Sequence, residues 1–390
     1  MKSFTSAIAT LVLILTGCAN APATPTSAHA DSAGVDIATY TGADLTLGWR
    51  FQPRFVLGGE EKEGESFYRV SSELVHADSS GNLYILDRDS YRVLVFDSAG
   101  TFLRAMGREG GGPGEFKLTL SFTVANDGTS ALFDLGKRSL VRFDADGGVL
   151  PEMNLPAQYF GGSIHLDGGA LILPVQNLDD GERTDELHRL TAMDSSVLAA
   201  VVLPPGKQLR LESCGMSFSG LGPLFSPTLR WSARGNTLAV ATTDAYEIRV
   251  FRDNTLMRSF RRSLRPLAAT REAAIRELGE GMRVRTDRGV VTCAPDEVVE
   301  QRGFAAVIPA IARIEIDPDG RLWVERGHIA DDEAPIDLYD VGGDYLGTLP
   351  AGSPFPVTFL TASRPVTITT DELDVTRVAV HELVVETGWK

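Results

Sequence analysis

The sequence contains only three cysteines among its 390 residues, and it lacks the common local signatures of catalysis. It has no Gly-x-Ser-x-Gly, no His-Glu-x-x-His, no pair of Cys-x-x-Cys motifs and no phosphate-binding loop. The glycine-rich run at 109–114 is not followed by the lysine and the helix that a phosphate loop requires, so we interpret it as a connector between strands. The usual sequence evidence for an enzyme is therefore absent.

Basic charge is also scarce. The 37 lysines and arginines face 52 aspartates and glutamates, which gives a formal net charge of −15 at pH 7. Nucleic-acid binding depends mainly on cations that neutralise phosphates, so we do not expect a chain this acidic to bind nucleic acid. We interpret the excess as an acidic surface exposed to water.

Long apolar runs are missing too, and the run near the amino end is short. Residues 7–15 follow Lys2 and are too few to cross a bilayer as a helix, which is typical of a secretory signal. The next residues, Leu15-Thr16-Gly17-Cys18, resemble the lipobox of bacterial lipoproteins, in which the signal is removed and the cysteine takes a lipid. A plain secretory signal cleaved at Ala28-His29-Ala30 is the alternative, but this site lies far from the apolar run.

The lipobox interpretation predicts a signal peptide over 1–18, lipidation at Cys18 and a flexible tether over 19–44, which is small, polar and proline-containing. No aspartate follows Cys18, so we expect an anchor in the outer membrane of the cell envelope, with the folded body facing the periplasm or the cell surface. The lipid would be the chain's only contact with a membrane.

Two cysteines remain after Cys18. In an oxidising compartment, Cys214 and Cys293 could form a disulfide, and two separate buried thiols are equally consistent with their spacing.

A pattern of short strands recurs along the rest of the chain. Residues 73–106 contain four short apolar or alternating runs, with an Asp-x-x-Gly turn between the last two. Similar runs end at Phe96-Asp97, Phe143-Asp144 and Tyr339-Asp340. A period of about 40–50 residues with several short strands is typical of a propeller blade. We expect the recurring aspartates, including Asp87, to cap turns rather than to catalyse a reaction.

Five such blades lie between 73 and 349, and the tail at 356–383 provides three strands of a sixth. The missing strand is expected at 45–57, because residues 54–67 resemble residues 104–116. The sequence therefore predicts an all-β fold over 45–390. It is a six-bladed β-propeller of four-stranded antiparallel blades, closed by the N-terminal strand joining the last blade. An insertion at about 263–303 contains one predicted helix. It would either have a function on one face of the ring or form a lid that only covers the core.

The stretch AMGREGGGPGEF (105–116), followed by strand and turn residues, resembles the NHL-type six-bladed propellers, especially those of secreted bacterial lipoproteins. The resemblance covers about 45–386. It implies a binding platform, since most members of this broad group bind ligands, and a minority are lyases or hydrolases with a metal in the central channel.

Equivalent positions of the predicted innermost strands hold His76, His165 and Glu315, each two residues before an aspartate. Such positions can converge on the axis of a ring, and these side chains are legitimate ligands of zinc or iron. Ordinary packing between blades is the alternative, because Thr123 and Trp231 fill the same position in other blades.

Together these patterns favour a lipid-anchored, non-catalytic platform that binds a protein, peptide or glycan of the envelope. We expect a monomer without a cofactor. The alternative is a metal-dependent lyase or hydrolase with zinc, iron or calcium in the central channel. A third possibility is a purely structural envelope component.

Overall fold

The computed structural model describes residues 26–385 except for short gaps at 33–34, 60–65, 68–69, 156–158, 160, 168, 180–181, 192, 287–288, 331, 371 and 373–374. The predicted signal peptide, Cys18 and the first part of the predicted tether lie outside the described residues. No helix within the described ranges is long and apolar enough to cross a membrane.

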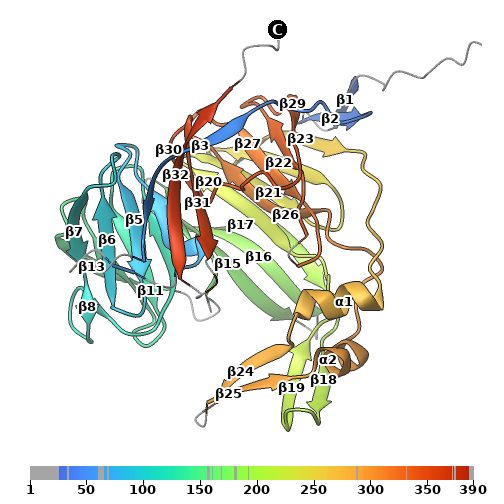
Figure 1. Ribbon diagram of the computed structural model, residues 1–390, viewed down its shortest axis with the longest axis horizontal. Coiled ribbons are helices and arrows are strands. Elements are labelled where there is room, and N and C mark those ends of the chain that lie inside the picture. The colour runs from blue at the N-terminus through green and yellow to red at the C-terminus, as the bar shows by residue number, and fades with distance from the viewer. Residues whose placement is uncertain are drawn as a thin grey trace, which may run out of the picture.

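Six four-stranded antiparallel units form a closed ring (Figure 1), and the strands of each unit follow chain order from the inside outward, except that β3 is the outermost strand of the last unit. The predicted all-β architecture is confirmed. Blade one consists of β4 (Val75–Ala77), β5 (Leu83–Asp87), β6 (Arg92–Phe96) and β7 (Phe102–Met106). Blade two consists of β10 (Thr119–Val124), β11 (Ser130–Asp134), β12 (Ser139–Phe143) and β13 (Val149–Asn154). Blade three consists of β14 (His165–Asp167), β15 (Ala170–Asp179), β16 (Glu182–Leu190) and β17 (Ser195–Leu203).

The remaining blades follow the same order. Blade four consists of β20 (Leu229–Arg234), β21 (Thr237–Thr242), β22 (Glu247–Arg252) and β23 (Thr255–Arg262). Blade five consists of β26 (Ile311–Ile316), β27 (Leu322–Arg326), β28 (Ile336–Tyr339) and β29 (Tyr345–Leu349). Blade six consists of β30 (Thr358–Thr361), β31 (Arg364–Thr370), β32 (Thr376–Val384) and β3 (Arg50–Leu57). The glycine-rich run is a connector, as predicted, between the short paired strands β8 (Arg108–Glu109) and β9 (Glu115–Phe116).

The ring is closed by pairing between the two ends of the chain. Strand β3 pairs antiparallel with β32, from Arg50 opposite Val384 to Leu57 opposite Val378. The expected N-terminal closure is confirmed, and it leaves no open sheet edge between the first and last blades.

The chain before β3 differs from the prediction. Strands β1 (Thr26–Ser32) and β2 (Val35–Thr41) form a hairpin, and β2 pairs in parallel with β23 at the outer edge of blade four. Ala38 and Tyr40 are buried there, and the Tyr40 hydroxyl donates to the carbonyl oxygen of Gly343 at 3.0 Å. The prediction of a flexible tether is therefore wrong for this stretch, because a tyrosine and small side chains fill the junction of blades four and five.

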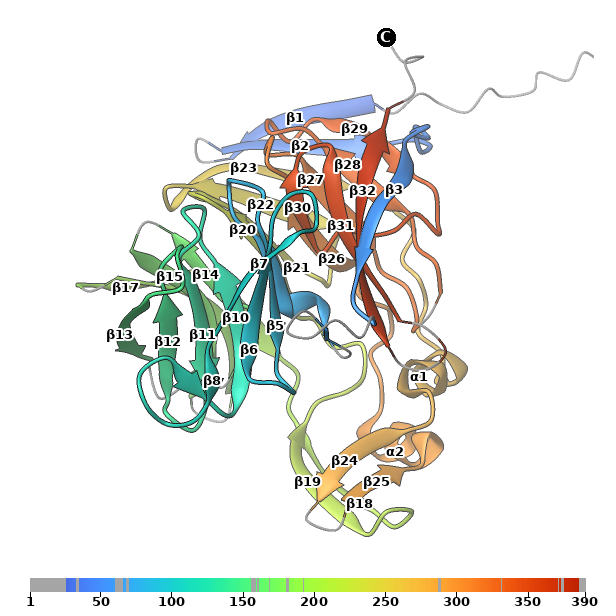
Figure 2. The ribbon, with the colours of Figure 1, turned by 60° about the vertical axis from the view of Figure 1, so that its left-hand side comes forward.

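Two insertions form a subdomain outside the ring. The first, between β17 and β20, contains β18 (Lys207–Leu211) and β19 (Met216–Leu221). The second, between β23 and β26, contains α1 (Arg271–Leu278), β24 (Met282–Thr286), β25 (Gly289–Cys293) and α2 (Pro295–Arg302). Both leave the ring where an outer strand connects to the next inner strand, so they emerge on the same face of the ring and lie together (Figures 1 and 2). We call residues 207–221 and 271–302 the insert subdomain.

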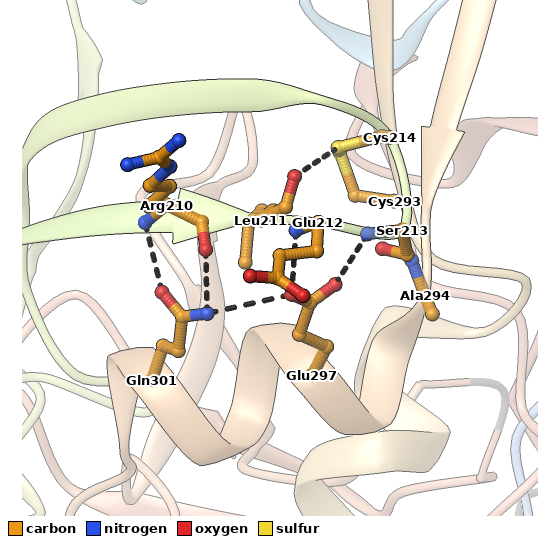
Figure 3. The surroundings of a disulfide bond; sticks show 9 residues. All are labelled: Arg210, Leu211, Glu212, Ser213, Cys214, Cys293, Ala294, Glu297 and Gln301. Carbon is orange, nitrogen blue, oxygen red and sulfur yellow. Dashed lines mark hydrogen bonds between the residues drawn. A yellow bond between two sulfur atoms is a disulfide. The ribbon is translucent and has the colours of Figure 1, made fainter.

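A disulfide joins the two halves of the insert subdomain (Figure 3). The Cα atoms of Cys214 and Cys293 are 4.8 Å apart. Nearby, the Glu297 carboxylate on α2 accepts hydrogen bonds from the backbone amides of Glu212 and Ser213 at 2.6 and 3.0 Å. The helix therefore caps the β18–β19 turn of the other insertion.

Candidate functional site

The innermost strands of all six blades surround a cavity of about 630 Å³, which we call the central cavity. Because every blade contributes its first strand or the residues beside it, the cavity lies on the axis of the ring. A concave site with a few converging polar groups is the usual place for a ligand.

The three residues predicted as metal ligands all line this cavity. The Nε2 atom of His76 on β4 lies 3.1 Å from the carbonyl oxygen of Glu73, and that of His165 on β14 lies 3.3 Å from the carbonyl oxygen of Gly235. On β26, the carboxylate of Glu315 accepts a hydrogen bond from the Ser232 hydroxyl at 3.2 Å.

The structure does not bring these three side chains together as a ligand set. Across the described ranges, no group of three or more histidines, cysteines, aspartates and glutamates is arranged to hold a metal ion. The reason is local: His76 and His165 turn a ring nitrogen toward a backbone carbonyl, and Glu315 is held by the serine of the neighbouring strand.

Two arginines that the sequence analysis did not single out lie in the same cavity. Arg230 and Arg234 belong to β20, and each donates from Nε to a backbone carbonyl of β26, of Ala312 at 2.8 Å and of Ile316 at 2.9 Å. Neither forms a salt bridge with a carboxylate of the described residues, whereas Arg313 binds Glu325 through two hydrogen bonds of 2.6 Å. Neither guanidinium group is therefore hydrogen-bonded to a carboxylate of the described residues, although the nearby carboxylates of Glu315 and Asp317 act on Arg234 electrostatically.

A spacing of two residues explains how β20 builds this wall. Arg230, Ser232 and Arg234 alternate with Trp231 and Ala233, so they project from one face of the strand and all reach β26. The run LRWSAR shows that the two arginines share one face of the strand, but it does not show their partners on β26.

The ionisable groups of the cavity have shifted pKa values. Burial raises the pKa of Glu315 to about 7, an effect that nearby Arg234 partly offsets. Burial, reinforced by His165, lowers the pKa of His76 to about 4. Burial also lowers the pKa of Arg230 and Arg234, yet arginine remains protonated at physiological pH. Near neutral pH the lining of the cavity therefore includes the cations Arg230 and Arg234, a neutral His76 and a partly protonated Glu315.

A family model agrees with this architecture. DUF5128, described as a 6-bladed beta-propeller, matches residues 71–199, which form blades one to three except for the end of β17. The chain is a six-bladed β-propeller. No curated protein matches its sequence.

Solved structures share the fold of this propeller at low sequence identity. A member of the duf4221 family from Bacteroides vulgatus ATCC 8482 is 10% identical, with a TM-score of 0.54, over 87% of this chain and 98% of the other. A putative exported protein from Bacteroides fragilis NCTC 9343 is 14% identical, with a TM-score of 0.49, over 90% of this chain and 100% of the other. At 10% identity, the likeness to the duf4221 member shows the fold alone.

Proposed function

We propose that the protein is a non-catalytic binding platform of the bacterial cell envelope, anchored by a lipid on Cys18, that holds a carboxylate-bearing ligand in its central cavity. The observation that carries the proposal is the pair Arg230 and Arg234, which line the cavity without a hydrogen bond or ion pair to a carboxylate of the described residues. Arginine is well suited to bind carboxylates through its planar donors.

The contrast with other arginines of the ring supports this assignment. The buried Arg262 and the half-buried Arg326 both bind Asp337, with N–O distances of 2.7 Å. A half-buried cation such as Arg234 that lacks a hydrogen-bonded counter-ion costs free energy, so a chain with excess carboxylates would ordinarily pair it. A ligand that brings its own carboxylate would remove this cost.

Two features support the proposed location in the cell envelope. The amino end resembles a lipoprotein signal, and the disulfide between Cys214 and Cys293 is the kind of bond that persists in oxidising compartments. The rigid ring then presents the cavity in the envelope.

Binding of short peptides tests the proposal. We expect peptides with several glutamates to bind the purified protein, and peptides in which glutamine replaces glutamate to bind at least tenfold more weakly, since each charge-assisted hydrogen bond contributes about 1.5–3 kcal/mol. The double variant Arg230→Ala, Arg234→Ala should lose this preference in isothermal titration calorimetry.

The matched control is Arg252→Ala, which removes an exposed arginine of β22 that does not line the cavity. This variant should bind like the parent protein. Equal binding of acidic and neutral peptides, or an unchanged affinity in the double variant, would contradict the proposal.

A further inference from the structure

Two further hollows lie beside the central cavity on the face that carries the insert subdomain. A small hollow of about 260 Å³ shares Arg230, Ala312 and Arg313 with the central cavity. A larger hollow of about 620 Å³ shares Ile308, Pro309 and Gly327 with the small one. Because neighbouring hollows share lining residues, they adjoin one another, and we call the three together the radial groove.

The radial groove runs from the inside of the ring to its rim at the junction of blades four and five. Its inner end is formed by innermost strands, and its outer end includes Thr39 of β2 and residues 261–267 at the end of β23. The second insertion leaves the ring at this junction, between 263 and 310, so the chain does not cross the junction by a short loop. The two connections of the insertion, residues 264–267 and 307–309, line this end of the groove.

The two ends of the groove differ in chemistry. The inner end holds Arg230 and Arg234, which have no hydrogen-bonded carboxylate among the described residues. The outer end is mainly apolar, and two of its side chains remain exposed although they are large and aliphatic, Leu267 at 52% and Val307 at 39%. Its apolar lining includes Leu264, Pro266, Leu267, Val307, Ile308 and Pro309, and its charged lining includes the arginines 261, 262, 265 and 326. Exposed aliphatic side chains beside a hollow mark a place where an apolar group can be buried.

We infer that the ligand is a linear peptide with an acidic group in the central cavity and an aliphatic side chain in the outer hollow of the radial groove. The inference rests on the proposed function and specifies its ligand. A peptide fits both ends, because it combines carboxylates with aliphatic side chains on one chain, whereas a glycan has no comparable apolar group.

The ring sets the spacing between the two groups. Inner and outer strands of a four-stranded blade are separated by three steps of about 4.8 Å, or about 14 Å in total. An extended peptide rises about 3.3 Å per residue, so the acidic and aliphatic residues should be about four or five positions apart.

Fluorescence anisotropy with labelled peptides tests this spacing. The probes carry two glutamates at one end and a pair of leucines either directly adjacent, four positions away, or replaced by serines. We expect the four-position peptide to bind about tenfold more tightly than the serine peptide, and the adjacent peptide to show little gain.

Two leucines with almost equal exposure provide the variant and its control. Leu267→Asp, in the outer hollow, should abolish the gain from leucine but leave binding of the serine peptide unchanged. Leu118→Asp changes a leucine that is 51% exposed and lies outside the groove, and it should change neither affinity.

The outcomes separate the two proposals. If the serine peptide binds but leucine adds nothing, or if the gain persists in Leu267→Asp, the radial groove is wrong while the proposed function stands. If no acidic peptide binds, the proposed function fails as well. If an acidic oligosaccharide competes more strongly than any peptide, the ligand is not a peptide.

Discussion

Aspartates at the hairpin turns are the residues that fix the strands of each blade. In three turns with a half-buried aspartate, one carboxylate oxygen accepts the backbone amides two and four residues later: Asp97 from Ala99 and Thr101, Asp144 from Asp146 and Gly148, and Asp340 from Gly342 and Asp344. Asp87 likewise accepts the amides of Asp89 and Ser90. The predicted capping role is confirmed.

Asp78 should be the most costly of these turn aspartates to remove. It is 4% exposed and accepts hydrogen bonds from Ser80, Asn82 and the hydroxyl of Tyr84, so its loss leaves several buried donors unsatisfied. We expect Asp78→Ala to lower the free energy of unfolding by about 3 kcal/mol in urea denaturation. Asp97→Ala, at an exposed turn of the same blade, is the matched control and should cost clearly less. Equal losses would contradict the importance of burial.

Ligand binding should depend on the protonation of Glu315. Its pKa of about 7 reflects burial, the neighbouring cation Arg234 and the carboxylate of Asp317. As the pH rises through 7, a negative charge forms beside Arg234, so the affinity for acidic peptides should fall several-fold between pH 6 and pH 8. Glu315→Gln should bind equally at both values in titration calorimetry. His76 contributes no charge in this range, because its pKa is about 4.

The same group affects stability with a defined sign. The folded protein holds the Glu315 proton more tightly than the unfolded chain, in which the group titrates near 4.5. The contribution of this residue to stability therefore decreases as the pH rises from 4.5 toward 7. Its removal in Glu315→Gln should stabilise the fold at pH 8 relative to the parent and change little at pH 4, as measured by thermal unfolding.

Individual residues differ in how far their roles could be predicted from the sequence. The capping role of the turn aspartates could be predicted, because the backbone amides that they bind lie within four residues. The cavity position of His76, His165 and Glu315 could also be predicted, since the blade repeat places them on the innermost strands. The roles of Arg230 and Arg234 could not be predicted, because their hydrogen-bond acceptors are carbonyl groups of a strand about eighty residues away.

At the scale of secondary structure elements, the insert subdomain depends on few buried side chains. Its central cluster contains Leu209, Leu211, Cys293 and Val298 as fully packed members. A core this small needs a covalent link or strong polar contacts to stay folded. The disulfide and the hydrogen bonds of Glu297 and Gln301 to the β18–β19 hairpin provide both.

Breaking the disulfide should therefore loosen the insert subdomain before the ring. The bond closes a sequence separation of 79 residues, and the chain-entropy estimate for loops of this length is about 4 kcal/mol. In Cys214→Ser, Cys293→Ser, we expect hydrogen exchange at 207–221 and 282–293 to accelerate at least tenfold, while exchange in β5 and β6 stays unchanged. Glu297→Gln, which weakens one cap and keeps the disulfide, is the milder comparison. Uniform acceleration across the ring would contradict an independent subdomain.

Local sequence signals predicted only part of this subdomain. Helix α1 was predictable, because the side chain of Thr270 accepts the amide of Ala273 at the start of the helix. The two hairpins and α2 were not, because they are short and become stable only when segments from two separate insertions pack together. For the same reason, the sequence did not distinguish a disulfide between Cys214 and Cys293 from two separate buried thiols.

At the scale of the whole molecule, the amino-terminal part of the chain binds the outer side of three successive blades. Strand β2 joins blade four, Thr46 bridges to Thr348 in blade five, and β3 completes blade six. The closure was predictable from the count of strands, which left the last blade one strand short. The hairpin β1–β2 was not predictable, since its small and polar residues are equally typical of a flexible tether.

If the proposed lipid is attached to Cys18, this arrangement determines which side of the protein faces the membrane. The β1–β2 hairpin and the insert subdomain lie at opposite ends of the molecule in both views (Figures 1 and 2). The eight residue steps from Cys18 to Thr26 span at most about 28 Å, so the hairpin must stay close to the bilayer. The insert subdomain would then face away from the membrane.

Energy transfer to a lipid-bound acceptor measures this orientation. In vesicles carrying the full lipidated chain, a donor at Ala28→Cys on the exposed hairpin should transfer strongly, and a donor at Ser217→Cys on β19 weakly. A flexible insertion of about thirty residues between Cys18 and Thr26 is the control, and it should reduce the difference because the ring can then turn and move away. A short tether at the hairpin places residue 28 close to the bilayer and residue 217 far from it. Equal transfer from both donors in the chain without the insertion would therefore contradict the fixed orientation.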